Sequence, residues 1–284
     1  MSTALFDCVE PFFLDSAGGS IFCVYHQPPK GVEVKGQVLV AMPFNEEMNR
    51  CRSMVTLQAQ AFAALGIGTL VVDLFGTGDS AGEYRDARWD LWLEDLATGY
   101  QWLSQKPGSK RGLLGIRLGS LLAADFLKNQ PHPDLSLICW QPVMDGFQHF
   151  TQFLRLRVAA QMQRTDLSQE TTASLRQQLA EGKTVEVGGY EIHPELAASI
   201  DAIKLGLLAP NPDTPVFWLE QRGHEATQLP PASQKVHKQW AEAGVHPAVA
   251  LFDGPAFWQV YLREIAGHAI ELTSSWLNAQ WSEA

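Results

Sequence analysis

The 284-residue sequence is poor in cysteine and has no long apolar run. Its four cysteines are scattered at positions 8, 23, 51 and 139, without a C-x-x-C pair. This usage excludes a disulfide framework and a zinc site, and it is typical of a reducing compartment. Residues 1–7 lack the basic and apolar regions of a signal peptide, and no stretch approaches the roughly 20 apolar residues that cross a bilayer. We therefore expect a cytoplasmic protein without a membrane span.

Runs of lysine and arginine are also missing, and the formal net charge is -10. A nucleic-acid partner is therefore not expected. The pair Gly76-x-Gly78 follows an apolar run, but the third glycine and the acidic residue of a dinucleotide site are absent. We expect no cofactor and no metal. The length fits one large α/β domain or a core domain that carries an insertion.

Short apolar runs alternate with segments of helical periodicity along most of the chain. Buried strands are predicted at 38–43, 68–74, 113–116, 135–140, 215–220 and 248–252, after a hairpin over 10–26. Helices are predicted at 54–65, 89–105, 120–127, 232–243 and 261–277. This alternation predicts βαβ units and a largely parallel sheet with an antiparallel hairpin leading in.

The segment 147–212 interrupts this alternation. It is polar and mostly helical, with a small hairpin indicated at 184–192 around Gly188-Gly189. No parallel strand fits inside it, so we interpret it as a cap inserted over the C-terminal edge of the sheet. The core would then comprise residues 1–146 and 213–284.

This order of elements is similar to that of the α/β-hydrolase fold, with a mostly parallel central sheet, helices on both faces and an inserted helical cap. More narrowly, MPFNEEMNRCR, VVDLFGTGDSAGEYRDARWDLWLEDL, GIRLGSLLA and FDGPAFWQ resemble the second of two hydrolase families associated with the exosortase A system. Those families occur in bacteria that export proteins with a PEP-CTERM signal and usually make exopolysaccharide. The resemblance implies a hydrolase acting on an ester, thioester or acyl small molecule, although the family name follows the fold.

The stretch GLLGIRLGSLLA, residues 112–123, has the strand–turn–helix pattern of the nucleophile elbow G-x-S-x-G, with Arg117 in the place of serine. A guanidinium stays protonated and cannot attack a carbonyl. Ser120 lies three residues further on, inside the predicted helix, and is interpreted as a packing residue rather than a displaced nucleophile. We therefore expect resistance to serine-reactive fluorophosphonates.

The loop that carries the catalytic histidine in this fold has none here. Phe257 occupies its expected place after the last strand, because His246 precedes that strand and His268 lies in the terminal helix. His224 is the one histidine expected at the catalytic edge, either as a functional group or as an exposed loop residue. With nucleophile and base both missing, a Ser-His-acid mechanism is not expected.

The acid of the triad normally follows the penultimate strand. Glu225 is close to that place, and Glu220 and Asp145 are alternatives at strand ends. The sequence does not decide which of these carboxylates is the equivalent of the acid.

Arg117 has two interpretations that the sequence leaves open. The turn would aim it into the cleft, where the backbone N–H of Leu118 begins a helix, and a helix N-terminus with a guanidinium attracts a carboxylate or phosphate. Alternatively, Arg117 is paired with a carboxylate of the loop after strand 38–43, where Glu46 or Glu47 could reach it. That loop, which would face the elbow, contains Phe44, Asn45, Glu46 and Glu47. Both can hold if one carboxylate orients the guanidinium towards a ligand.

Two function classes follow. In the first, the protein is a hydrolase that works by a non-serine route, with water activated by Glu46, Glu47 or Glu225 beside Arg117. In the second, it is a catalytically silent binding or scaffold protein, a pseudoenzyme in which Arg117 holds an anionic ligand beneath the cap. Phe257 and Trp258 could line a pocket for an apolar chain or seal it. The oligomeric state does not follow from the sequence.

Overall fold

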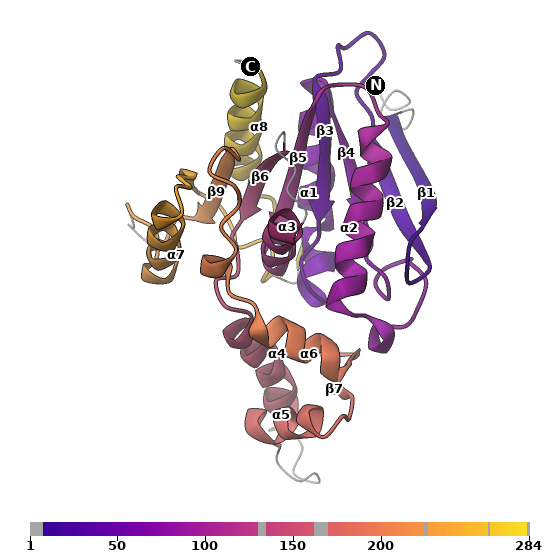
Figure 1. Cartoon of the computed structure of the whole chain (residues 1–284), viewed down its shortest axis with the longest axis vertical. Helices are drawn as coiled ribbons and strands as arrows, with labels where there is room; N and C mark the ends of the chain where they lie inside the picture. The colour runs from indigo at the N-terminus through magenta and orange to yellow at the C-terminus, as the bar shows by residue number, and fades with distance from the viewer. Residues whose placement is uncertain (1–7, 130–134, 162–169, 224–226, 261, 283–284) are drawn as a thin grey trace.

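A central eight-stranded sheet organises the computed structural model, which describes residues 8–129, 135–161, 170–223, 227–260 and 262–282. The strand order is β1-β2-β4-β3-β5-β6-β9-β10 (Figure 1). The strands are β1 (Val9–Asp15), β2 (Ser20–His26), β3 (Gly36–Ala41), β4 (Ile67–Val72), β5 (Lys110–Ile116), β6 (Leu135–Trp140), β9 (Val216–Gln221) and β10 (Ala248–Phe252).

The sheet is mostly parallel. Only the leading hairpin β1–β2 and the pairing of β2 with β4 are antiparallel, and the other neighbours run in the same direction. Strands β3 to β6 are almost entirely buried, since helices cover both faces. The predicted architecture, a parallel sheet with an antiparallel hairpin leading in, is confirmed.

Two layers of helices enclose the sheet. On one face lie α2 (Trp89–Ser104), α3 (Leu118–Asn129) and α7 (Pro231–Glu242), and on the other lie α1 (Glu46–Ala64) and α8 (Gly267–Ser282). Helix α1 begins eight residues before the predicted start at 54. Its first two turns already bury Met48 and Cys51, but polar neighbours hide this spacing in the sequence.

The segment between β6 and β9 packs at the carboxyl ends of the strands, below the sheet in Figure 1. It contains α4 (Gly146–Gln161), α5 (Thr172–Ala180), the hairpin β7 (Val185–Val187) and β8 (Tyr190–Ile192), α6 (Pro194–Ala202) and the short helix η3 (Leu205–Leu207). The hairpin is antiparallel and forms its own two-stranded sheet. We call the segment 147–212 the cap; its separation from the core at these boundaries remains a prediction.

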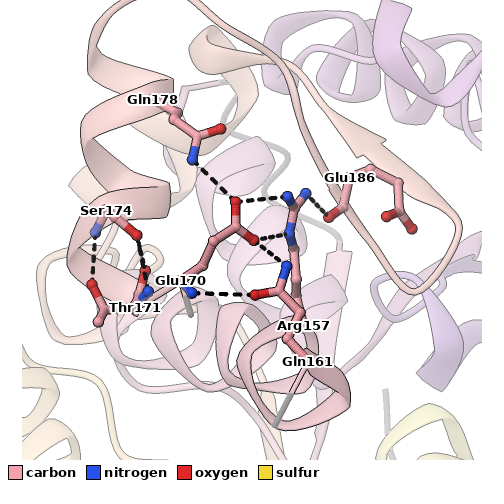
Figure 2. Close-up of polar contacts among 7 residues, drawn as sticks. All are labelled: Arg157, Gln161, Glu170, Thr171, Ser174, Gln178 and Glu186. Atoms are coloured by element: carbon pink, nitrogen blue, oxygen red, sulfur yellow. Dashed lines mark hydrogen bonds and ion pairs between the residues drawn. The ribbon is translucent and has the colours of Figure 1, made fainter. Parts of the chain in front are cut away.

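A carboxylate ties the elements of the cap together (Figure 2). Glu170 accepts hydrogen bonds from Nε and Nη2 of Arg157 at 2.6 and 2.8 Å, and also from the side chains of Gln161 and Gln178. Arg157 also donates to the backbone oxygen of Glu186 in β7 at 2.8 Å. Helices α4 and α5 and the hairpin are therefore fixed to one another by a single charged cluster.

Candidate functional site

The backbone is strained where three strands end. Among the described residues, Asn45, Arg117 and Gln141 are the non-glycine residues with positive φ, at 53°, 56° and 44°. They follow β3, β5 and β6, which are adjacent in the sheet. Such conformations are costly for residues with a Cβ and cluster at functional sites. The strain therefore marks the carboxyl edge of the sheet, beneath the cap, as the candidate site.

The turn between β5 and α3 has the form of a nucleophile elbow with Arg117 at its apex. The backbone N–H of Arg117 donates to Trp140, and its carbonyl accepts from Ser120 and Val143. Gly119 is required by packing, because a Cβ there would lie 2.2 Å from the carbonyl oxygen of Ala41 in β3. The strand–turn–helix geometry is thus held by backbone bonds and close packing, independently of the side chain at 117.

The guanidinium of Arg117 is paired with Glu47. Its Nε lies 3.1 and 3.2 Å from the two carboxylate oxygens and its Nη2 lies 3.1 Å from Oε1, while Nη1 donates to the backbone oxygen of Gln141 at 3.1 Å. Only 14% and 18% of the two side chains are exposed. Of the two carboxylates that could have reached Arg117, Glu47 makes the contact, and Glu46 lies 3.6 Å from Arg50 instead.

Burial and charge act in opposite directions on Glu47. Burial raises the pKa of the carboxyl above its ordinary value, and the charge and hydrogen bonds of Arg117 offset only part of this rise. The pair is therefore a partly desolvated one, in which the carboxylate depends on the guanidinium to remain charged.

A histidine stands beside this pair, and it is one that the sequence did not single out. His149, in the first turn of α4, lines the same cavity as Arg117 and lies 6.1 Å from the ring of Phe44. Burial and, to a lesser extent, the charge of Arg117 lower the pKa of His149 to about 3. The imidazole is thus neutral at physiological pH and is a weak base. Its position nine residues after the end of β6, inside the predicted cap, gave no signal for a catalytic role.

Two cavities meet at this edge. The larger, about 380 Å³, we call the apolar cavity; its lining includes Leu74, Tyr84, Trp92, Leu118, Leu122 and Tyr190. The smaller, about 260 Å³, we call the polar cavity; its lining includes Glu46, Glu47, Arg50, Arg117, His149 and Trp258. Phe44 and Asn45 line both. Neither cavity is lined by a serine or a cysteine from the described residues.

The aromatic pair after β10 is divided between core and cavity. Phe257 is 1% exposed, packs against Trp140 with ring centroids 5.9 Å apart, and lines neither cavity. Trp258 lines the polar cavity, with its ring 5.4 Å from the guanidinium carbon of Arg117. The expectation that Phe257 could line a ligand pocket is therefore corrected, because the ring fills the core behind the elbow.

Other candidate residues from the sequence have structural roles or lie apart. Ser120 is fully buried and donates to the carbonyl of Gly115. Glu220 is 1% exposed and accepts from the indole of Trp218, and burial raises the pKa of its carboxyl. Asp145 accepts from the backbone N–H of Gln148 at the start of α4.

Among the described residues, the histidines outside the cap line neither cavity. His268 accepts from the backbone N–H of Asp253 through Nδ1, and His246 is exposed. His224 and Glu225 fall outside the described residues. The expectation that His224 is the one histidine at this edge was wrong, since His149 lies there.

Within the described ranges no three histidine, cysteine, aspartate or glutamate side chains are grouped to hold a metal ion. In the same residues no helix combines the length and apolar character that a bilayer span requires.

Comparisons with known proteins agree with this architecture. The family model described as serine aminopeptidase S33 matches residues 32–181, slightly more than half of the chain. A search of curated proteins found no match.

Solved structures resemble the chain over nearly its whole length. Est1E from Butyrivibrio proteoclasticus, solved with ferulic acid, is 14% identical over 96% of this chain and 98% of its own, with a TM-score of 0.64. A thermostable carboxyl esterase from Bacillus coagulans, in complex with glycerol, is 14% identical over 96% and 99%, with a TM-score of 0.65. A hypothetical protein from Pseudomonas aeruginosa is 15% identical over 98% and 95%, with a TM-score of 0.66.

Because their sequence identities to this chain are low, the solved structures establish only the fold. The family model establishes the family. The chain has the α/β-hydrolase fold and belongs to the serine aminopeptidase S33 family.

Proposed function

We propose that this protein binds a small molecule beneath the cap and carries out no serine-hydrolase reaction, with Arg117 in the position where active relatives present their nucleophile. One observation carries the proposal: the strained turn holds a guanidinium paired with Glu47, and no serine or cysteine of the described residues lines either cavity. A guanidinium cannot act as a nucleophile at physiological pH.

The surroundings of the turn also support ligand binding without a serine-hydrolase reaction. Phe257, in the loop where the fold carries its base, is a core residue packed on Trp140. The pKa of His149 is lowered to about 3, far from the value near the working pH that a general base needs. The site is therefore better suited to holding a ligand than to transferring its protons.

The ligand we propose is anionic or acylated. Arg117 lines the polar cavity, and its side chain is still 14% exposed after pairing with Glu47. The larger neighbouring cavity is lined largely by apolar and aromatic side chains. Glu47 would thus orient the guanidinium of Arg117. The anionic group of the ligand would lie in the polar cavity and its apolar part in the apolar cavity.

A second candidate is a hydrolase for an ester, thioester or acyl substrate that works without a serine. Membership of a hydrolase family favours it, and two of the similar structures are described as esterases or as bound to an aromatic acid. In this mechanism Glu47, with its pKa raised by burial, would activate a water molecule beside Arg117. Its engagement with Arg117 counts against it, since both carboxylate oxygens are already hydrogen-bonded.

The cellular setting we propose follows the sequence resemblance to the exosortase A-associated hydrolases. The protein would act in the cytoplasm of bacteria that export PEP-CTERM proteins. The buried thiols Cys23, Cys51 and Cys139, none of which forms a disulfide, support a reducing compartment.

The two functions are separated by turnover and by ligand-dependent stability. Purified protein is incubated with short p-nitrophenyl esters and thioesters, and its melting temperature is measured with and without acetate, octanoate and phosphate. We expect no turnover, and a rise in melting temperature with at least one anion that disappears in Arg117→Ala. The matched control Arg155→Ala removes an exposed arginine of α4 and should keep the rise.

Turnover that is abolished by Glu47→Gln would overturn the binding proposal in favour of the hydrolase. Labelling by a fluorophosphonate at any serine would overturn both.

A further inference from the structure

Asn45 carries an unsatisfied amide at the junction of the two cavities. The residue is 4% exposed, and its Nδ2 and Oδ1 are both buried without a hydrogen-bond partner among the described residues. It precedes α1 at the N-cap position, where an asparagine normally accepts from the helix backbone, yet its side chain makes no capping bond. The donor and acceptor of this amide are therefore both available to a ligand.

The backbone holds this amide at an energetic cost. Asn45 adopts φ 53° and ψ -126°, outside the regions that residues with a Cβ favour. An unpaired buried amide is also unfavourable, because it has lost water and gained no partner. Two independent costs at one residue, on the wall of both cavities, indicate that a ligand supplies the missing bonds.

The missing bonds define the ligand's chemistry. A primary amide offers one donor and one acceptor side by side, so its best partner presents an acceptor and a donor on the same side. The N–H and a carboxylate oxygen of an extended α-amino acid unit have this arrangement. An ester of a hydroxy acid has the same shape but no N–H to donate to Oδ1.

On the polar side of Asn45, donors for an anion are present. Arg117 lines the polar cavity, and so does Trp258, whose Nε1 is buried without a partner in a residue 2% exposed. A carboxylate whose first oxygen accepts from Asn45 has its second oxygen free for these donors.

On the apolar side one more polar atom is unpaired. The hydroxyl of Tyr84 is buried without a partner, and the ring of Tyr84 packs 6.3 Å from that of Phe44, the neighbour of Asn45. Beyond it the apolar cavity is lined by side chains such as Leu74, Trp92 and Leu122. The cavity therefore fits a hydrocarbon chain with one hydrogen-bond acceptor close to its polar end.

We propose that the ligand is an N-acyl amino acid. Its carboxylate and N–H pair with the amide of Asn45, its second carboxylate oxygen faces Arg117 and Trp258, its acyl carbonyl accepts from Tyr84, and its chain fills the apolar cavity. This inference rests on the proposed binding function and names the ligand class of the same site.

The test uses N-decanoylglycine as the probe, with binding to the full chain measured by calorimetry. Three analogues each remove one recognition element: O-decanoylglycolate lacks the N–H, N-decanoylglycine methyl ester lacks the carboxylate charge, and N-acetylglycine lacks the chain. We expect each analogue to bind about tenfold more weakly or worse, because each leaves a buried group of the site unpaired or a cavity empty. Equal affinity for the amide and the ester analogue would overturn the role of Asn45.

Two variants test the residues. Asn45→Asp keeps the size and replaces the donor by a negative charge, and Tyr84→Phe removes only the hydroxyl. Both should weaken N-decanoylglycine by about tenfold. The matched control Asn49→Asp puts the same charge on an exposed position of α1 and should leave the affinity unchanged. If Asn45→Asp does not fold, the comparison of Tyr84→Phe with the parent decides; unchanged affinity there contradicts the proposal.

The outcomes separate this inference from the proposed function. If octanoate or phosphate stabilises the protein through Arg117 but N-decanoylglycine binds no better than N-acetylglycine, the binding function stands and the ligand class is wrong. If N-decanoylglycine is bound and then hydrolysed to decanoate and glycine, the ligand class stands and the silent function is wrong.

Discussion

Arg117 and Glu47 are joined by a partly buried ion pair, with Nε of the arginine 3.1 and 3.2 Å from the two carboxylate oxygens. The partners are far apart in sequence and come from the elbow after β5 and from the first turn of α1. Both residues line the polar cavity, and the pair links the strained turn at Arg117 to the start of α1, directly after the strained Asn45. The ion pair thus joins the elbow to α1 by an electrostatic contact. Its contribution to the free energy of unfolding can be measured.

Glu47→Gln should destabilise the fold. The substitution keeps the shape of the side chain but leaves the guanidinium of Arg117, a side chain only 14% exposed, without a countercharge. Loss of one partner of a buried pair costs about 3–5 kcal/mol, and the partial exposure here reduces our expectation to about 1–3 kcal/mol. Urea denaturation at neutral pH measures it. Glu46→Gln, whose side chain is 42% exposed, is the control; equal losses in both variants would contradict a special role for Glu47.

His149 should make stability depend on pH. Its pKa is lowered in the folded state to about 3 from the ordinary value of 6.5, so the unfolded chain binds a proton first as the pH falls. This contribution is fully present above pH 6.5 and is lost as the pH falls from about 6.5 towards about 3, at up to about 1.4 kcal/mol per pH unit. In His149→Gln this part of the slope disappears. Denaturation curves between pH 7 and 4 measure it, and the slope must change more than in His246→Gln, which removes an exposed imidazole.

Gly119→Ala should destabilise the elbow, because the added Cβ collides with the main chain of β3. The added Cβ would lie 2.2 Å from the carbonyl oxygen of Ala41 and 2.6 Å from that of Met42, so α3 and β3 must move apart. Overpacking of this kind costs about 1–3 kcal/mol. Gly267→Ala is the matched control, because no atom lies within 4 Å of its new Cβ. Both variants are compared by thermal and urea unfolding. A larger loss of stability in Gly267→Ala than in Gly119→Ala would show that α3 can move away from β3 at little cost.

Glu170→Gln should loosen the cap without unfolding the core. Burial disfavours the charge of Glu170, but hydrogen bonds from Arg157, Gln161 and Gln178 outweigh it and lower the pKa of the carboxyl. Its stabilising contribution is present above the ordinary pKa of a glutamate and is lost as the pH falls below it. Hydrogen exchange at pH 7 should show faster exchange of the amides of α4 and α5, with β3 and β5 unchanged. Glu181→Gln, which changes an exposed carboxylate of the same cap, should leave these rates as in the parent.

The sheet was predictable from the sequence because its central strands are continuous apolar runs. Continuous apolar runs such as VLVAMP and LSLICW are typical of strands that are buried on both faces. Their order along the chain, alternating with helices, therefore predicts a parallel sheet covered by helices. The start of α1 was less visible, because residues such as Asn49 and Arg52 interrupt its apolar spacing.

The site was predictable only in part, for a physical reason. The strand–turn–helix pattern is local, so the turn at Arg117 could be predicted, and Glu47 was one of the two glutamates named as a possible partner. The contact of His149 with this site depends on how α4 returns over the sheet edge, which no local pattern encodes. The unpaired amide of Asn45 is likewise a property of the packed structure, since an asparagine before a helix ordinarily predicts a cap.

The tight contact of Gly119 with β3 has a consequence for how genomes are interpreted. Because any larger residue there collides with the main chain whether or not the protein is an enzyme, folding stability alone is enough to retain the glycine. The glycines that flank the turn would therefore be retained in a chain without a nucleophile, so they do not by themselves identify an enzyme. The residue between those glycines has to be inspected before a reaction is assigned.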